Sequence, residues 1–259
     1  MSGPERTVEA VIDGTIGRIT LNRPDRMNAV TVALASELAA ALRDLGAHPD
    51  LNAIVIRGAG GNFCAGGDFD EVERLRAQGP EALRYLFTEF RHACDAVAEI
   101  DVPVIAAVDG VAAAGGFELM QAADIVLVSD TARIADNHIR FGMIPGGGST
   151  ARLPRLIGRQ QALALLLSGD RLSGCDAVAR GLAYRAYPPK DFEPGVESFL
   201  SDLAGRSRQA VVSIKRLVGS GLTGSLDAAL TNETDAVVRH IIGSGASGAA
   251  AFDCREVSS

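Results

Sequence analysis

The chain has 259 residues and a formal net charge of −7, and this length is enough to bury a full-sized core in one domain, with or without a helical appendage. The acidic balance, 25 Lys and Arg against 32 Asp and Glu, argues against a nucleic-acid partner, because phosphate binding needs a basic face. No run approaches the ~20 apolar residues of a membrane span, and the N-terminus lacks an apolar leader, so we expect a cytoplasmic protein without a membrane partner.

The first elements are predicted from short local patterns. Residues 8–12 and 17–21 are β-rich, and Asp13-Gly14 between them is a hairpin signal. Thr31 is a suitable N-cap for an amphipathic helix that ends at Leu45. We therefore expect a hairpin followed by a helix that packs on it.

Apolar strands and helices then alternate along the chain. Residues 53–57, 104–108 and 125–128 are continuous apolar runs, and residues 70–100 have a helical pattern with a break near Gly79-Pro80. Such alternation predicts a largely parallel sheet that is covered on both faces.

Helical patterns dominate after Pro154. They cover residues 159–167, 175–180, 193–204, 206–218 and 226–242. These helices suit a layer that packs on the sheet domain or on a neighbouring subunit. Periodicity alone thus predicts an α/β domain followed by helices, and no internal repeat is evident in the sequence.

Two glycine-bearing turns are the strongest chemical signal. They occupy residues 63–68 and 109–118, and each opens a predicted helix, where backbone N–H groups are free of intrahelical partners. Two such donors that converge on one point would form an oxyanion hole, which stabilises charge developing on a carbonyl oxygen. A carboxylate, Glu118, follows the second turn at once.

Further motifs at ordered spacing identify a family. A third glycine stretch, residues 142–150, follows the polar cluster Asp136-Asn137-His138. With these motifs, the chain resembles the crotonase (enoyl-CoA hydratase/isomerase) superfamily from about Val8 to about Arg255. The resemblance is carried by Leu21-Asn22-Arg23-Pro24, Met27-Asn28-Ala29, the Ala65 and Gly115 turns, Ile144-Pro145-Gly146-Gly147-Gly148 and Leu167-Ser168-Gly169-Asp170-Arg171.

The resemblance implies an α/β architecture built as a spiral of ββα repeats with a C-terminal helical trimerisation region. Residues 1–195 would form the spiral core with the active site, and residues 196–259 the helical region. It also implies a homotrimer, or a hexamer made of two trimers. The substrate would be an acyl-CoA thioester, with coenzyme A as part of the substrate and no tightly bound cofactor.

By motif position, the resemblance implies that the N–H groups of Ala65 and Gly115 hold the thioester oxygen. Glu118 matches the first of two catalytic glutamates, and its apolar helix predicts burial and a raised pKa. The second glutamate is replaced by His138, a side chain that can both give and take a proton at physiological pH. The histidine is compatible with water addition or with a different reaction on the same enolate.

Several residues are expected along the coenzyme A path. Arg26 would lie near the phosphates, and Gly66, Gly67, Asp68 and Phe69 would line the adenine and pantetheine path. The 144–148 stretch is expected to shape the pocket wall, because no Walker-type loop is present. The C-terminal residues 251–257 depart from the usual family ending, which puts a coenzyme A contact from a neighbouring subunit in doubt.

The four cysteines, at 64, 94, 175 and 254, have no metal-ligand spacing, so we expect free thiols and no metal. Hydration of a 2,3-enoyl-CoA is the leading prediction. Double-bond isomerisation, which needs only Glu118, and thioester or carbon–carbon hydrolysis stay open as alternatives on one enolate. A non-catalytic binding protein is a fourth possibility, which the retained Glu118 and the acidic charge disfavour.

Overall fold

The computed structural model describes residues 6–243, and the chain divides into two compact units after Arg206. The expected boundary at residue 195 is too early, because it falls inside helix α8 (Pro189–Ala204). Phe192, Val196 and Leu200 of this helix are buried in the core of the first unit. Helix α8 therefore belongs with the sheet.

Most predicted elements of the first unit are present, with small shifts at their ends. Its strands are β1 (Val8–Asp13), β2 (Ile16–Leu21), β3 (Ala53–Gly58), β4 (Val104–Val108), β5 (Val111–Ala113), β6 (Ile125–Ser129), β7 (Arg133–Ala135) and β8 (Arg185–Tyr187). Its α-helices, besides α8, are α1 (Val32–Gly46), α2 (Phe69–Gln78), α3 (Pro80–Glu99), α4 (Gly115–Ala122), α5 (Ser149–Ile157), α6 (Arg159–Ser168) and α7 (Gly174–Ala179). Short 3-10 helices are η1 (Pro24–Arg26), η2 (Ala59–Gly61) and η3 (His138–Phe141).

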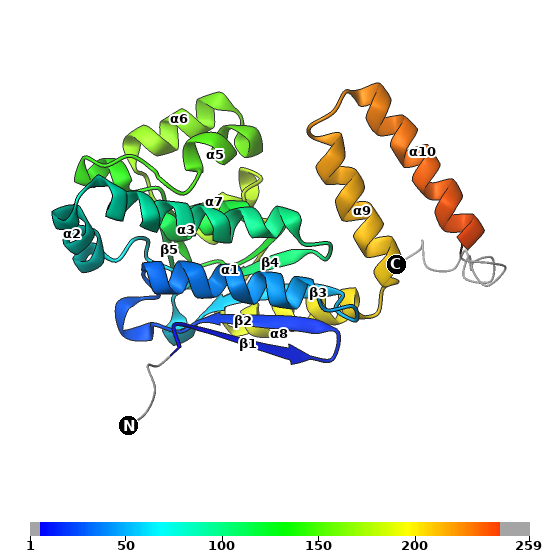
Figure 1. Cartoon of the computed structure of the whole chain (residues 1–259), viewed down its shortest axis with the longest axis horizontal. Coiled ribbons are helices and arrows are strands. Elements are labelled where there is room, and N and C mark those ends of the chain that lie inside the picture. Colours follow the sequence, from blue (N-terminus) through cyan, green and yellow to red (C-terminus); the bar gives the residue numbers. More distant parts are fainter. Residues whose placement is uncertain (1–5, 244–259) are drawn as a thin grey trace. The chain divides into compact units, whose positions relative to one another are not determined.

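The main sheet has the strand order β1-β2-β3-β4-β6-β8, in which β1 and β2 form the predicted antiparallel hairpin and the other pairs are parallel. Ala53 and Val55 of β3 pack toward α8. Side chains alternate across a strand, so Ile54 faces the opposite side, where it lies beside Leu45 of α1. Helices α1 and α3 lie side by side over this second face (Figure 1).

A second, small sheet creates the spiral. Its strands β5 and β7 pair in parallel, and Cys64 forms a parallel bridge with Ala112 of β5. The chain thus passes three times from a main-sheet strand to the small sheet and on to a helix, after β3, β4 and β6. Because these small-sheet segments are parallel, the residues that follow Cys64, Ala113 and Ala135 leave the same edge. This is where the predicted site residues lie.

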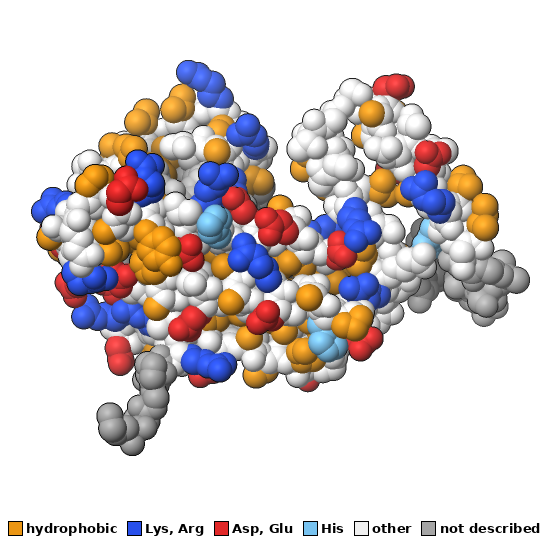
Figure 2. Space-filling view, in the orientation of Figure 1, with side chains coloured by type: hydrophobic (Ala, Val, Ile, Leu, Met, Phe, Trp, Pro, Cys, Tyr) orange, Lys and Arg blue, Asp and Glu red, His pale blue; other side chains and the backbone are white. Residues whose placement is uncertain are grey.

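The second unit contains α9 (Arg208–Gly221) and α10 (Leu226–Gly243), which pack on each other. Apolar side chains of this unit are exposed, and several gather on α10 (Figure 2). The exposed residues are Ile214 and Val218 on α9, Leu222 directly after it, and Leu226, Leu230, Val237, Val238, Ile241 and Ile242 on α10. No helix within residues 6–243 is both long and apolar enough to span a bilayer.

Candidate active site

The two glycine turns touch each other. A Cβ added at Gly66 would lie 3.3 Å from the backbone nitrogen of Gly115, and a Cβ added at Gly115 would lie 3.6 Å from the carbonyl carbon of Gly66. That carbon is bonded to the nitrogen of Gly67, so peptide groups of both turns lie side by side. The bridge between Cys64 and Ala112 holds the segments in this register.

The N–H groups of Gly67 and Gly115 are among those that these turns leave without an acceptor in the described residues. Ala65 donates its N–H to the carbonyl oxygen of Met27 at 3.0 Å, so the expectation that Ala65 holds the thioester oxygen is wrong. Gly67 forms an isolated bridge with Val30 through its neighbours' backbone groups, and its own N–H has no acceptor among residues 6–243. Gly115 is the first residue of α4, where an N–H has no intrahelical acceptor.

Glu118 lies in the first turn of α4 and is 2% exposed. Its Oε1 accepts hydrogen bonds from the backbone N–H groups of Gly147 at 2.7 Å and Ser149 at 3.0 Å. Position 147 needs glycine, because a Cβ there would lie 2.3 Å from the ring of Phe90 and 2.9 Å from Oε2 of Glu118. The glycine stretch therefore orients the carboxylate, a contact that the sequence does not predict.

The electrostatics of Glu118 suit proton transfer. Burial raises the pKa of its carboxyl group, although the N–H of Ser149, the charge of His138 and the N–H of Gly147 oppose the rise. The expected direction of the pKa shift is thus confirmed. Oε2 bonds no described residue, so one oxygen is held in place while the other can exchange a proton.

His138 begins η3, directly beyond β7, and its side chain is 12% exposed. Its Nδ1 lies 2.7 Å from Oδ1 of Asp136, whose side chain is buried. A carboxylate only accepts, so Nδ1 carries a hydrogen and Nε2 is the ring atom without a bond to any described residue. The sequence marks Asp136 only as a neighbour of His138, and a carboxylate two residues before a histidine is the signal that could have identified it.

Both predicted catalytic side chains share one electrostatic environment. Burial by itself lowers the pKa of His138, but the hydrogen bond and charge of Asp136, together with the charge of Glu118, raise it above the ordinary value. The charge of His138 in turn lowers the pKa of Glu118. Each of the two side chains thus affects the pKa of the other.

The residues expected along the coenzyme A path differ in their burial and in their side-chain partners. Asp68 is buried, lies 2.8 Å from Nη2 of Arg23 and caps α2, so its side chain holds the turn rather than facing a ligand. Arg26 pairs with Asp70 at 3.0 Å, and both side chains are exposed. Phe69, at the start of α2, is 72% exposed.

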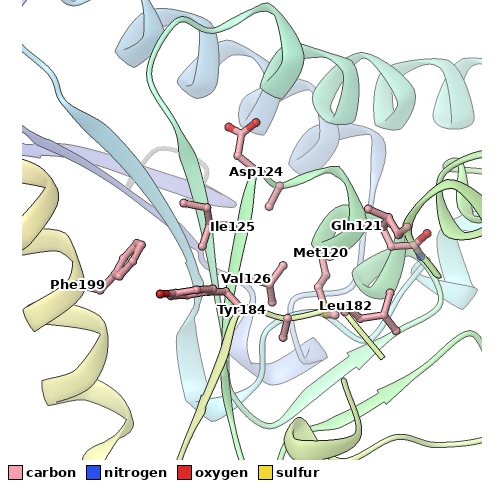
Figure 3. A pocket seen from close by; sticks show the side chains of 12 residues that line it. Met120, Gln121, Asp124, Ile125, Val126, Leu182, Tyr184 and Phe199 are labelled. Atoms are coloured by element: carbon pink, nitrogen blue, oxygen red, sulfur yellow. The ribbon is translucent and has the colours of Figure 1, made fainter. Parts of the chain in front are cut away.

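A cavity of about 320 Å³ lies near the C-terminal end of α4, away from the predicted site residues (Figure 3). The rings of Tyr184 and Phe199 border it on one side, and Gln121 lies on the other.

In the described part of the chain, no three His, Cys, Asp or Glu side chains are placed to hold a metal ion. Burial raises the pKa of the free thiols of Cys64 and Cys94 to about 12. The C-terminal residues 251–257, with Cys254, lie outside the described residues.

Comparisons with known proteins agree with this architecture. The sequence model of the enoyl-CoA hydratase/isomerase family matches residues 11–249. A probable enoyl-CoA hydratase of Mycobacterium leprae is 32% identical over 225 residues, which cover 86% of each chain. The mitochondrial enoyl-CoA hydratase of Pongo abelii is 35% identical over 214 residues, which cover 83% of this chain and 72% of that protein.

Solved structures extend the likeness to the fold. An enoyl-CoA hydratase from Polaromonas sp. JS666 superimposes with a TM-score of 0.89 at 30% identity, covering 95% of this chain and 96% of that one. An enoyl-CoA hydratase from Bacillus anthracis has a TM-score of 0.84 at 29% identity, covering 89% of both chains. With its spiral core and matching sequence, the chain belongs to the enoyl-CoA hydratase/isomerase family.

Proposed function

We propose that this chain adds water across the 2,3 double bond of an enoyl-CoA thioester. The observation that carries the proposal is the buried carboxylate of Glu118, held by two backbone N–H groups within electrostatic reach of His138. The turns of Gly67 and Gly115 supply unbonded N–H groups beside each other. The names of the relatives support the substrate class, in which coenzyme A is part of the substrate rather than a bound cofactor.

The proton transfers balance between two side chains. Oε2 of Glu118 takes a proton from the water whose oxygen bonds to C3. Electrons of the double bond move toward the thioester oxygen, which accepts hydrogen bonds from the N–H groups of Gly67 and Gly115. Charged His138 gives the proton on Nε2 to C2. Glu118 has then gained one proton and His138 has lost one, so a transfer between them restores the site.

Turnover of crotonyl-CoA in deuterated water separates this reaction from its alternatives. Hydration consumes the conjugated thioester and places deuterium at C2. Isomerisation moves the double bond without adding water, and hydrolysis releases a free thiol. We expect the 3-hydroxyacyl thioester as the main product. Isomerised or hydrolysed product alone would contradict the proposal.

Gly67 offers a matched pair of variants for the oxyanion donor. A Cβ at this position meets only Val72, at 3.7 Å, so Gly67→Ala should fold and keep its N–H. Gly67→Pro removes the N–H, and the loss of one donor should lower kcat by about 10²–10³. Thermal unfolding of both variants checks that they are folded. Equal rates for the alanine and proline variants would remove Gly67 from the oxyanion hole.

We also propose that the protein assembles as a homotrimer, or as a hexamer of two trimers. Support comes from the exposed apolar side chains of α9 and α10, because closed symmetric assemblies are the usual way to bury such faces. Light scattering at micromolar concentration measures the mass, and a monomeric mass would exclude the assembly.

A further inference from the structure

We propose that Asp136 is a positioning residue that makes Nε2 of His138 the atom that loses and regains the proton. This inference rests on the proposed function of His138, but it concerns a residue to which that function assigns no task. It is carried by the geometry of the Asp136 carboxylate, by its burial and by the rigid strand that presents it.

One oxygen of Asp136 contacts both the ring and the backbone of His138. Oδ1 lies 2.7 Å from Nδ1 of the ring and 3.4 Å from the backbone nitrogen of His138. The short contact restrains the rotation of the ring and places a hydrogen on Nδ1. Nε2 is therefore left as the ring atom that can exchange a proton with substrate or with Glu118.

The backbone before Asp136 is held on both sides. Ala135 accepts a hydrogen bond from the N–H of Ala114, at the start of the second glycine turn. Ile134 exchanges two backbone hydrogen bonds with Leu172. Asp136 is thus fixed relative to the turn that carries Gly115, which gives the carboxylate a defined place in the site.

Burying the charged carboxylate of Asp136 destabilises the folded protein unless the imidazole of His138 offsets this free-energy cost. Asp136 is 2% exposed, and its Oδ2 has no hydrogen-bond partner in the described part of the chain. A buried carboxylate needs a charged or donating partner, and the imidazole of His138 is the side chain that supplies one. The charged groups that act on His138 are Asp136 and, from α4, Glu118. Asp136 therefore favours the charged ring that the proposed protonation of C2 requires.

The Asp136→Asn variant tests this arrangement at one atom. An asparagine amide can donate to Nδ1, and a neutral ring with that bond carries its hydrogen on Nε2. Nε2 could then no longer accept a proton from Glu118. We expect kcat to fall by about 10²–10⁴, the usual contribution of a positioned proton-transfer group, with little change in KM. Asp124→Asn is the matched control, because Asp124 accepts a backbone N–H, that of Val104, outside the candidate site.

A double-mutant cycle distinguishes positioning from a general structural effect. If Asp136 acts through His138, Asp136→Asn should cause almost no further loss of kcat in a His138→Ala background. Losses that multiply, together with a lowered thermal midpoint, would mean that Asp136 supports the fold and would overturn the inference.

Nitrogen NMR of the histidine ring gives a readout that is independent of turnover. The chain has four histidines, and the His138→Ala spectrum identifies the signal of His138. The neutral ring of the unchanged protein should carry its hydrogen on Nδ1, and its pKa should exceed that in Asp136→Asn. A hydrogen on Nε2 in the unchanged protein would refute the inference, even if the variant does not fold. Because the spectrum needs no substrate, it decides on Asp136 even if hydration is not observed.

Discussion

Glu118→Gln should remove most of the activity while making the folded protein more stable at neutral pH. The glutamine keeps an oxygen that can accept from Gly147 and Ser149, so the change removes little except the oxygen that takes a proton. Loss of a positioned general base lowers the rate by about 10²–10⁴. Each factor of ten is about 1.4 kcal/mol, so the barrier should rise by about 3–5 kcal/mol.

Two opposing effects decide the change in stability. Hydrogen bonds to the carboxylate of Glu118 are about 1 kcal/mol stronger each than bonds to a neutral amide oxygen. Burial of an ion costs several kcal/mol. Because the pKa of Glu118 is raised, the cost of burying the charge is the larger effect. Relieving this cost should outweigh the weaker hydrogen bonds.

The raised pKa of Glu118 also determines how the stability gained by Glu118→Gln depends on pH. A raised pKa means that the folded chain binds the proton more tightly than the unfolded chain, so this contribution to stability is present at low pH and is lost as the pH rises through the folded pKa. Glutamine resembles the protonated form at every pH. The stability gained by Glu118→Gln should therefore appear at neutral pH and vanish below about pH 4, under the ordinary pKa of glutamate.

The assays are crotonyl-CoA hydration and urea unfolding at neutral and acidic pH. Glu197→Gln is the control, since Glu197 pairs with Arg18 and Arg57 and its pKa is lowered by the Arg18 hydrogen bond. That variant should lose stability at neutral pH and keep its rate. An unchanged rate in Glu118→Gln, or a loss of its stability at neutral pH, would refute the account of Glu118.

Three further predictions test the scaffold. Gly116→Ala would place a Cβ 2.0 Å from the carbonyl oxygen of Cys64, so it should cost about 1–3 kcal/mol in urea unfolding and lower kcat by separating the turns. Thr31→Ala removes the N-cap of α1 and should cost about 1 kcal/mol by the same measurement, with kcat unchanged. Although burial opposes the shift, the Arg23 hydrogen bond lowers the pKa of Asp68. The ionised carboxylate therefore stabilises the fold above the ordinary pKa of aspartate, and this contribution is lost as pH falls through the pKa of the folded protein. Asp68→Asn should therefore destabilise the protein at neutral pH and much less in acid, as acid titration of unfolding would show.

Local sequence signals determine most of the long elements of this protein. Thr31 caps α1 by accepting from the N–H of Leu34, and Gly79-Pro80 separates α2 from α3, because capping and chain breaking act within a few residues. The burial of Glu118 is likewise predictable from the apolar residues around it on the helix. The strands β5, β7 and β8 have three residues each, too few to show a period, and α5, which runs through Pro154, precedes the first helix predicted after that proline, at residues 159–167.

The chemistry of the site depends on contacts that only the tertiary structure decides. Glycines predict turns, but the free donor is Gly67 rather than Ala65 because β-bridge formation brings Met27 to the N–H of Ala65. The orientation of Glu118 depends on Gly147, which lies beyond two strands in sequence and is held between the carboxylate and Phe90 of α3. The sequence determines which groups can donate or accept protons. Which of them remain unpaired depends on segments far apart in sequence, whose hydrogen bonds form only when the parallel sheets set their register.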